Sequence, residues 1–320
     1  MNKLRYILVL TVLLIHSGSF GQQGDDSSRI SLGFPLYSQY LHNGLMINPA
    51  YAGSREALSL AISHRTQWMG TDGAPSLESL SIHAPLKNDK VALGLKGSLM
   101  RYGATKMSSV YAVYAYHIQF ARGKLSFGLG AGADISNTDY SGLEGIVRPD
   151  PVFVNNDKPY ILPNVNAGLY YFSNKFFAGL SVPSFLCYRN TGNGNTQTYH
   201  SFNEYDFIVT AGGLITFAQA FKFKPSFLVN YSLNDSKKLN QLDINGNFII
   251  ADILWVGGSW RTTEEVVVGL LQAQINQQLM IGFSYDYPAG RMSTYSKGSG
   301  EFFLRYEFGS KVSAANPRYF

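Results

Sequence analysis

The chain has 320 residues, of which only 15% are charged, and it is rich in Gly (32), Tyr (21) and Phe (21). Removing a leader that carries Lys3 and Arg5 leaves 26 − 2 = 24 basic residues against 21 acidic ones, a net charge of +3. That charge is too small and too scattered for a nucleic-acid-binding surface, and the single cysteine, Cys187, excludes an intramolecular disulfide.

The first 21 residues have the order of a secretory signal peptide. The two basic residues are followed by an apolar run, Tyr6–Ile15, and by small residues at Ser19 and Gly21 that suit cleavage before Gln22. The apolar run is too short to cross a bilayer as a helix. We therefore predict a cleaved signal peptide over residues 1–21 and export from the cytoplasm.

The next stretch, residues 22–54, precedes the first strand and carries no strand pattern as far as Asn48. Three alternatives stay open for it: a plug inside a barrel, a periplasmic arm or an unstructured leader.

Residues 55–310 alternate between apolar and polar side chains. In Val91–Leu99, Leu93 lies on one face and Lys96 on the other, and in Leu125–Ile135, Leu129 opposes glycines. A period of two predicts β-strands whose faces meet different environments. The predicted strands are Ala57–Trp68, Ser76–Ala84, Val91–Tyr102, Ser108–Phe120, Leu125–Ile135, Asn164–Phe172, Lys175–Val182, Asp206–Phe217, Phe221–Ser232, Leu242–Ala251, Leu254–Arg261, Glu265–Gln274, Leu279–Tyr287 and Glu301–Phe308.

A soluble sandwich has the same alternation with its apolar face turned inward. The aromatic content and the scarcity of charge favour the membrane. We therefore predict an all-β protein, a transmembrane antiparallel β-barrel of about 14 strands in the bacterial outer membrane. Leu93 and Leu129 are expected to face lipid, and residues 311–320 to form a C-terminal tail.

Two insertions interrupt the strands, Asn137–Tyr160 and Tyr188–Ser201. Both are predicted to be long loops on the outer side, because outer-membrane barrels keep short turns on the periplasmic side. Val152, Phe153 and Val154 form an apolar centre in the first insertion and are candidate partner-binding residues. The alternative is that this loop folds into the lumen as a plug.

Charged residues of both signs occur at positions expected to point inward. The mixture favours ion pairs across a closed lumen, and the alternative is that these residues line a pore. These residues are Arg65, Lys96, Asp134, Lys222, Lys224, Asp243, Arg261, Asp286, Arg305 and Glu307.

Sequence signatures of enzymes are missing. The chain has no HExxH or GxSxG motif. The glycines of Gly128–Gly132 lack the spacing of a phosphate-binding loop and share one strand face, which indicates close packing in the lumen. We predict no catalytic, cofactor-binding or metal-binding residues.

Several short motifs span nearly the whole mature chain, and their order is more specific than any one of them. They are Asn48–Gly53 (Asn-Pro-Ala-Tyr-Ala-Gly), Arg65–Trp68, Gly73–Pro75, Tyr114–Tyr116, Leu125–Leu129, Lys224–Phe227, Leu254–Gly257, Tyr285–Tyr287, Gly298–Glu301 and Asn316–Phe320. Together these motifs resemble the PorP/SprF family of type IX secretion proteins of Bacteroidetes.

The resemblance implies an outer-membrane barrel that works with the type IX secretion and gliding machinery. Its partners would be an exported protein, typified by the C-terminal domain of a surface adhesin, and periplasmic or outer-membrane secretion components. Arg65, Gln67, Trp68 and Tyr51 lie in the matching motifs and are further candidate partner-binding residues, although the motifs could equally serve folding. For Trp68 the simpler interpretation is an anchor at the membrane interface.

The leading functional hypothesis is an interaction protein that binds an exported protein or the secretion machine and supports surface anchoring. The alternative is a general or solute-specific porin, and a third possibility is a barrel enzyme.

Overall fold

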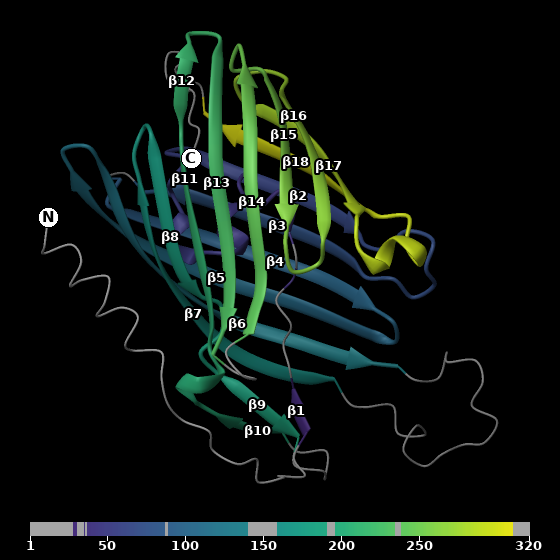
Figure 1. Ribbon diagram of the computed structural model, residues 1–320. Helices are drawn as coiled ribbons and strands as arrows, with labels where there is room; N and C mark the ends of the chain where they lie inside the picture. Colours follow the sequence, from purple (N-terminus) through teal and green to yellow (C-terminus); the bar gives the residue numbers. More distant parts are fainter. Residues whose placement is uncertain are drawn as a thin grey trace, which may run out of the picture.

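The chain forms a closed antiparallel β-barrel (Figure 1). The computed structural model describes residues 28–30, 35, 37–86, 89–139, 159–190, 196–233 and 238–309. The predicted signal peptide, the C-terminal tail and Val152–Val154 lie outside these residues.

The wall of the barrel follows the chain order. Its strands are β2 (Leu58–Thr66), β3 (Ser76–Pro85), β4 (Val91–Tyr102), β5 (Thr105–Phe120), β6 (Gly123–Thr138), β7 (Tyr160–Phe172), β8 (Phe176–Val182), β11 (Asp206–Gly213), β12 (Ile215–Ala218), β13 (Phe221–Ser232), β14 (Lys238–Ile250), β15 (Leu254–Arg261), β16 (Val266–Gln274), β17 (Leu279–Pro288) and β18 (Ser299–Phe308). The sheet closes because β11 pairs with both β8 and β13, and β18 pairs with β2.

The predicted fold is confirmed. The sheet has 15 segments, and β11 and β12 are two parts of one strand interrupted at Leu214, which gives 15 − 1 = 14 strands. Each predicted strand has its counterpart, including the hairpin of β16 and β17 around residues 275–278. β5 and β6 are longer than predicted, because their paired register continues to Thr105 and Thr138.

The two faces of the wall differ as the sequence predicts. Leu93 and Leu129 lie on the outer face and are 49% and 58% exposed, whereas Lys96 points into the lumen and is buried. On β5 the outward side chains are apolar or aromatic from Val110 to Phe120. Ten residues of strand tilted by about 40° cover about 26 Å along the barrel axis, close to the apolar band of an outer-membrane barrel.

The two ends of the barrel differ in the length of their connections. At one end the turns are short, for example residues 121–122, 173–175 and 219–220. At the other end the chain makes the two long connections, residues 139–159 and 183–205. Outer-membrane barrels turn their long connections outward, so we call the second end the outer end and the first the inner end.

A small sheet lies at the outer end, at the bottom of Figure 1. It consists of β1 (Ser28–Ile30), β9 (Cys187–Asn190) and β10 (Thr196–Tyr199), in the order β1-β9-β10. The predicted loop Tyr188–Ser201 therefore contains short strands. Because β1 pairs with a strand of the outer connection, the chain approaches the barrel from its outer end.

Short 3-10 helices complete the fold. They are η2 (Gly44–Met46), η3 (Pro49–Tyr51), η4 (Phe202–Glu204) and η5 (Arg291–Thr294). Within the described ranges, no helix has the length and apolarity needed to cross a membrane.

The apolar core lies inside the barrel. Leu45, Ala50 and Ala52, which precede the first wall strand, are fully buried and pack against inward side chains such as Val113 and Phe177. A second cluster joins Tyr37, Tyr40 and Ile47 to Ile208 and Leu228 on the wall, among others. Folding therefore buries residues from before the first wall strand within the barrel.

Candidate functional site

Residues 37–56 run through the barrel from its outer to its inner end, and we call them the lumen segment. Near its start, the backbone N–H of Ser38 donates to Glu301 at 2.7 Å, at the outer end of β18. Near its other end, Arg55 Nε lies 2.7 Å from Glu307 Oε1, at the inner end of the same strand. The chain therefore crosses the lumen before it enters β2.

Polar contacts join the middle of the lumen segment to strands on opposite sides of the wall. The side chain of Asn245 on β14 donates to Tyr40 Oη at 2.6 Å. Lys96 on β4 donates to the carbonyl oxygen of Met46 at 3.1 Å. The hydroxyl of Ser181 on β8 donates to the next carbonyl, that of Ile47, at 2.6 Å. Such contacts satisfy buried backbone groups that have no strand partner.

Asn48 explains the start of the Asn-Pro-Ala-Tyr-Ala-Gly motif. Its Oδ1 accepts a hydrogen bond from the Ala50 N–H at 2.9 Å and so caps η3. Its Nδ2 donates to the carbonyl oxygen of Leu169 on β7 at 2.9 Å. Pro49 occupies the first helical position, where a backbone N–H is not needed. The Asn48 side chain thus caps the start of η3 and attaches it to the wall strand β7.

Tyr51 and Gly53 continue the motif inside the barrel. The Tyr51 ring is buried and lies edge-on to His83 and Tyr170, with centroids 5.6 and 5.4 Å apart. The Gly53 N–H donates to His83 Nδ1 at 3.0 Å. Gly53 has a φ of 77°, a conformation that glycine adopts without strain.

Glycines on the wall make room for the lumen segment. A Cβ at Gly128 would lie 2.1 Å from the Ala50 nitrogen, and one at Gly168 would lie 2.1 Å from Asn48 Oδ1. Both separations are shorter than van der Waals contact, so any larger residue would push the segment away. The prediction that glycines near Gly128 serve close packing in the lumen is confirmed.

Five charged residues form an ion-pair cluster at the outer end of the lumen. Arg65 Nη2 lies 2.6 Å from Asp286 Oδ2, and its Nη1 lies 3.6 Å from Glu301 Oε2. Arg261 lies 3.1 Å from Asp286 and 3.1 Å from Asp243. All five side chains are almost completely buried. We call these residues, Arg65, Asp243, Arg261, Asp286 and Glu301, the outer charge cluster.

Ser38 ties the lumen segment to this cluster. Its Oγ accepts from Arg65 Nη1 at 2.9 Å and donates to Asp286 Oδ1 at 2.9 Å. Its backbone N–H also donates to Glu301. Ser38 is therefore bonded to the cation Arg65 and to both carboxylates, Asp286 and Glu301. Charge-assisted hydrogen bonds are stronger than neutral ones, so the cluster fixes the start of the lumen segment.

The ten charges predicted to point inward lie on the inner face of the wall, and opposite signs meet there. At the inner end Glu307 pairs with Arg55 and, at 3.3 Å, with Arg305. Lys222 pairs with Asp252 at 2.6 Å. Asp134 accepts from Ser109 and Tyr111. The expected ion pairing is therefore confirmed at both ends of the barrel.

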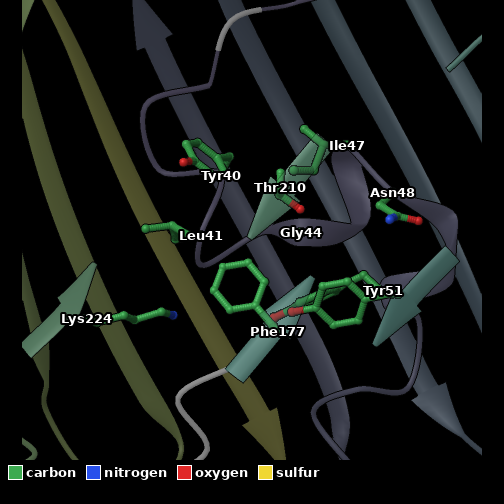
Figure 2. Close-up of a pocket in the computed structure, with 10 residues that line it drawn as sticks. Tyr40, Leu41, Gly44, Ile47, Asn48, Tyr51, Phe177, Thr210 and Lys224 are labelled. Atoms are coloured by element: carbon green, nitrogen blue, oxygen red, sulfur yellow. The ribbon is translucent and has the colours of Figure 1, made fainter. Parts of the chain in front are cut away.

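A small cavity remains beside the lumen segment (Figure 2). Its volume is about 20 Å³, and Tyr40, Tyr51 and Thr210 are among its lining residues. Lys224 reaches toward Phe177 there, with Nζ 5.3 Å from the ring centroid. A space of this size holds about one water molecule.

Two connections join at the outer end next to β2 and β18, and we call them the outer rim (residues 67–75 and 289–298). The Met69 N–H donates to the Gly298 carbonyl at 2.8 Å, and the Lys297 N–H donates to the Met69 carbonyl at 3.1 Å. Thr71 Oγ1 donates to the carbonyl of Tyr295 at 3.2 Å. These bonds hold two turns from distant parts of the chain as one surface.

Exposed aromatic side chains mark the outer rim. Tyr295 is 76% exposed and Trp68 is 42% exposed. Trp68 has a φ of 45°, which is an uncommon conformation for a bulky residue. Its backbone N–H donates to Ser299 Oγ at 3.1 Å. Local backbone strain of this kind costs about 1–3 kcal/mol and concentrates at functional sites.

The structure separates the candidate partner-binding residues into two places. Tyr51 is buried within the lumen segment, and Arg65 is buried against its Ser38. Gln67 is half-buried and Trp68 is exposed, and both lie on the outer rim. Tyr295 also lies on the outer rim, and the sequence does not single it out because its turn carries no strand pattern or motif. Val152, Phe153 and Val154 lie outside the described residues.

The small outer sheet is attached to the barrel through Tyr188. Its hydroxyl donates to the carbonyl oxygen of Pro163 at the outer end of β7. Burial, and then the nearby charge of Asp134, raise the pKa of Tyr188 above its ordinary value. The hydroxyl therefore stays protonated and able to donate.

Among the residues that the structure describes, no three or more His, Cys, Asp or Glu side chains are grouped so that they could hold a metal ion.

Comparisons with known proteins point to one family. The model of a family described as type IX secretion system membrane protein PorP/SprF matches residues 31–306. No curated protein matches the chain.

Two of the similar solved structures share little sequence identity with this chain. The monoaromatic hydrocarbon channel CymD is 12% identical over 88% of this chain and 94% of that chain, with a TM-score of 0.48. The toluene transporter TbuX of Ralstonia pickettii is 10% identical over 83% of this chain and 93% of its own, with a TM-score of 0.48.

Proposed function

Because the chain belongs to the PorP/SprF family of type IX secretion membrane proteins, we propose that it is a non-enzymatic interaction barrel of the bacterial outer membrane. It binds an exported protein, such as the C-terminal domain of a surface adhesin, or components of the secretion and gliding machinery. By this binding it supports secretion and surface anchoring.

The observation that carries this proposal is the occupied lumen. The lumen segment is buried and is fixed at both ends by charged contacts, through Ser38 and Arg55. Between these ends the segment packs against inward side chains of the wall, including Val113 and Phe177. A general or solute-specific porin needs a solute-sized path, so the occupied lumen favours an anchoring role over the porin alternative.

Conductance in planar bilayers tests this point. The purified full-length protein is expected to be electrically silent. Gly128→Leu is expected to open a pore, because a side chain there would collide with the backbone at Ala50 and displace the lumen segment. Gly269→Leu is the matched control, since Gly269 lies on the outer face and a Cβ there has room, with its nearest neighbour at 3.9 Å. Steady conductance of the unmodified protein would instead support the porin.

We propose the outer rim as the surface that contacts the partner. Trp68 and Tyr295 offer exposed aromatic surface on turns that hydrogen bonds hold together. Aromatic residues are enriched in the residues that dominate binding energy. Val152–Val154, on the long outer connection, stays a second candidate contact.

The double variant Trp68→Ala, Tyr295→Ala is expected to lower the amount of exported protein retained at the cell surface about tenfold or more. Each aromatic anchor is expected to contribute about 1–2 kcal/mol of binding energy. Immunodetection of surface proteins on intact cells measures this. Replacing Val152–Val154 with Ser-Gly-Ser tests the second candidate in the same assay. As a matched control, Phe217→Ala and Ile253→Ala remove exposed apolar side chains near the inner end. If only the control lowers retention, the contact lies at the inner end.

A further inference from the structure

The charged side chains described on the outer face of the barrel wall lie in one place. Among the barrel-strand side chains that the structure describes, the outward-facing acidic, basic or histidine residues are His64, Glu78, Arg101 and Lys106. They belong to four consecutive strands, β2 to β5, and all lie toward the outer end. The other outward side chains described on the wall are uncharged, so this patch needs an explanation beyond solubility.

The strand register brings these residues together. Arg101 and Lys106 are direct partners across β4 and β5, and His64 and Glu78 are direct partners across β2 and β3. Arg101 Nη1 donates to Glu78 Oε1 at 2.8 Å, and His64 Nδ1 lies 3.6 Å from the same oxygen. Arg101 is nevertheless about half exposed, with 48% of its side chain accessible.

The patch also supplies neutral hydrogen-bonding groups. The row that contains Arg101 and Lys106 continues sideways through Ser76 to Thr66 on one side and to Asn137 on the other. Arg101 and Lys106 outweigh the one carboxylate of Glu78 by a single positive charge. A guanidinium held on one side by a carboxylate keeps its remaining N–H groups for an anion. The set has the composition of a phosphate site.

The height of the patch fits the phosphate layer of the membrane. Leu93 pairs with Tyr114, which lies near the middle of the outward apolar run of β5, and Arg101 follows Leu93 on the same face of β4. Eight residues of strand tilted by about 40° raise Arg101 about 20 Å above that middle. The hydrocarbon layer extends about 13 Å from the middle of the bilayer, and the headgroup layer ends near 20–22 Å. Arg101 therefore lies within the headgroup layer. The patch therefore lies where lipid phosphates of the outer leaflet lie.

We propose that Arg101 and Lys106, with Glu78 orienting the guanidinium, form a binding site for the phosphate group of an outer-leaflet glycolipid of the lipid A type. The site is separate from the outer rim and lies on the lipid-facing side of the wall. It would fix the rotational position of this side of the barrel relative to its lipid shell.

Native mass spectrometry of the full-length protein tests the site, with added diphosphorylated lipid A as the probe. The unmodified protein is expected to retain one lipid A molecule, and the double variant Arg101→Gln, Lys106→Gln to retain it at least tenfold less. Lipid A from which phosphate has been removed is expected to bind the unmodified protein as weakly as the variant binds lipid A. Inorganic phosphate alone distinguishes a headgroup site from a free-phosphate site, because the proposal expects no competition from it at millimolar concentration.

The matched control is Arg122→Gln, Lys175→Gln, which removes two exposed basic residues from turns of the inner end. It is expected to retain lipid A like the unmodified protein, and Lys106→Arg is expected to do the same. Shift in electrophoretic mobility on heating establishes that each variant is a folded barrel. Equal retention by the Arg101/Lys106 variant and the control, binding that ignores the phosphates, or effective competition by inorganic phosphate would overturn the proposal. Loss of a co-purified protein with lipid A retention unchanged would also overturn it and assign the patch to a protein contact.

Discussion

Replacing Arg65 with leucine is expected to destabilise the folded barrel by about 3–5 kcal/mol, because removing one partner from a buried charge network leaves the others uncompensated. Arg65 lies 2.6 Å from Asp286 and 3.6 Å from Glu301, and all three side chains are almost fully buried. Asp286 would keep Arg261 at 3.1 Å, so Glu301 would lose the most. Urea unfolding in lipid vesicles, followed by tryptophan fluorescence, measures the change.

A second variant separates lost charge balance from lost packing. Arg65→Leu combined with Glu301→Gln removes the orphaned carboxylate together with its cation, and it is expected to recover part of the lost stability. A double variant no more stable than Arg65→Leu would contradict this assignment. Arg65 belongs to the motif that extends to Trp68, so the same pair of variants shows whether a loss of surface retention follows from misfolding or from a lost contact.

Introducing arginine at Leu129 is expected to destabilise the barrel by about 2–4 kcal/mol, since that is the cost of a cation on the lipid face at the middle of the bilayer. Leu129 is 58% exposed on the outer face, in the same row as Leu93 and Tyr114 near the centre of the apolar band. The energy measured in vesicles would report lipid contact, because an exposed residue in water tolerates arginine at little cost.

An arginine introduced nearer the membrane interface is the control for this substitution. Phe120 also faces outward and is 53% exposed, but it ends β5 at the inner interface. Arginine there is expected to cost about 0–1 kcal/mol. Equal costs at residues 120 and 129 would mean that the apolar band lies elsewhere along the barrel.

The wall of the barrel was predictable because strand alternation is a local signal. Each wall strand has its own period-two pattern, and consecutive strands pair, so neighbours in sequence became neighbours in space. The inward direction of residues such as Lys96 and Asp286 followed from the same pattern. The split between β11 and β12 at Leu214 was not predictable, because no proline or charge marks it.

The lumen segment was not predictable in detail, because its contacts join residues far apart in the sequence. Ser38 contacts Glu301, and Arg55 contacts Glu307. In each pair, almost the whole sequence of the barrel wall separates the two residues. The pairing of β1 with β9 has the same character. One sequence signal did point to the lumen: the glycines around Gly128 share a strand face, and the structure shows that they make room for the segment.

The comparison of a deletion strain with its parent tests the central claim most directly. Surface proteins of intact cells are quantified by labelling and mass spectrometry, alongside uptake of small solutes across the outer membrane. An interaction barrel with an occupied lumen predicts the loss of one or a few exported proteins from the surface and unchanged solute uptake. An unchanged set of surface proteins together with impaired uptake would contradict it and favour the porin.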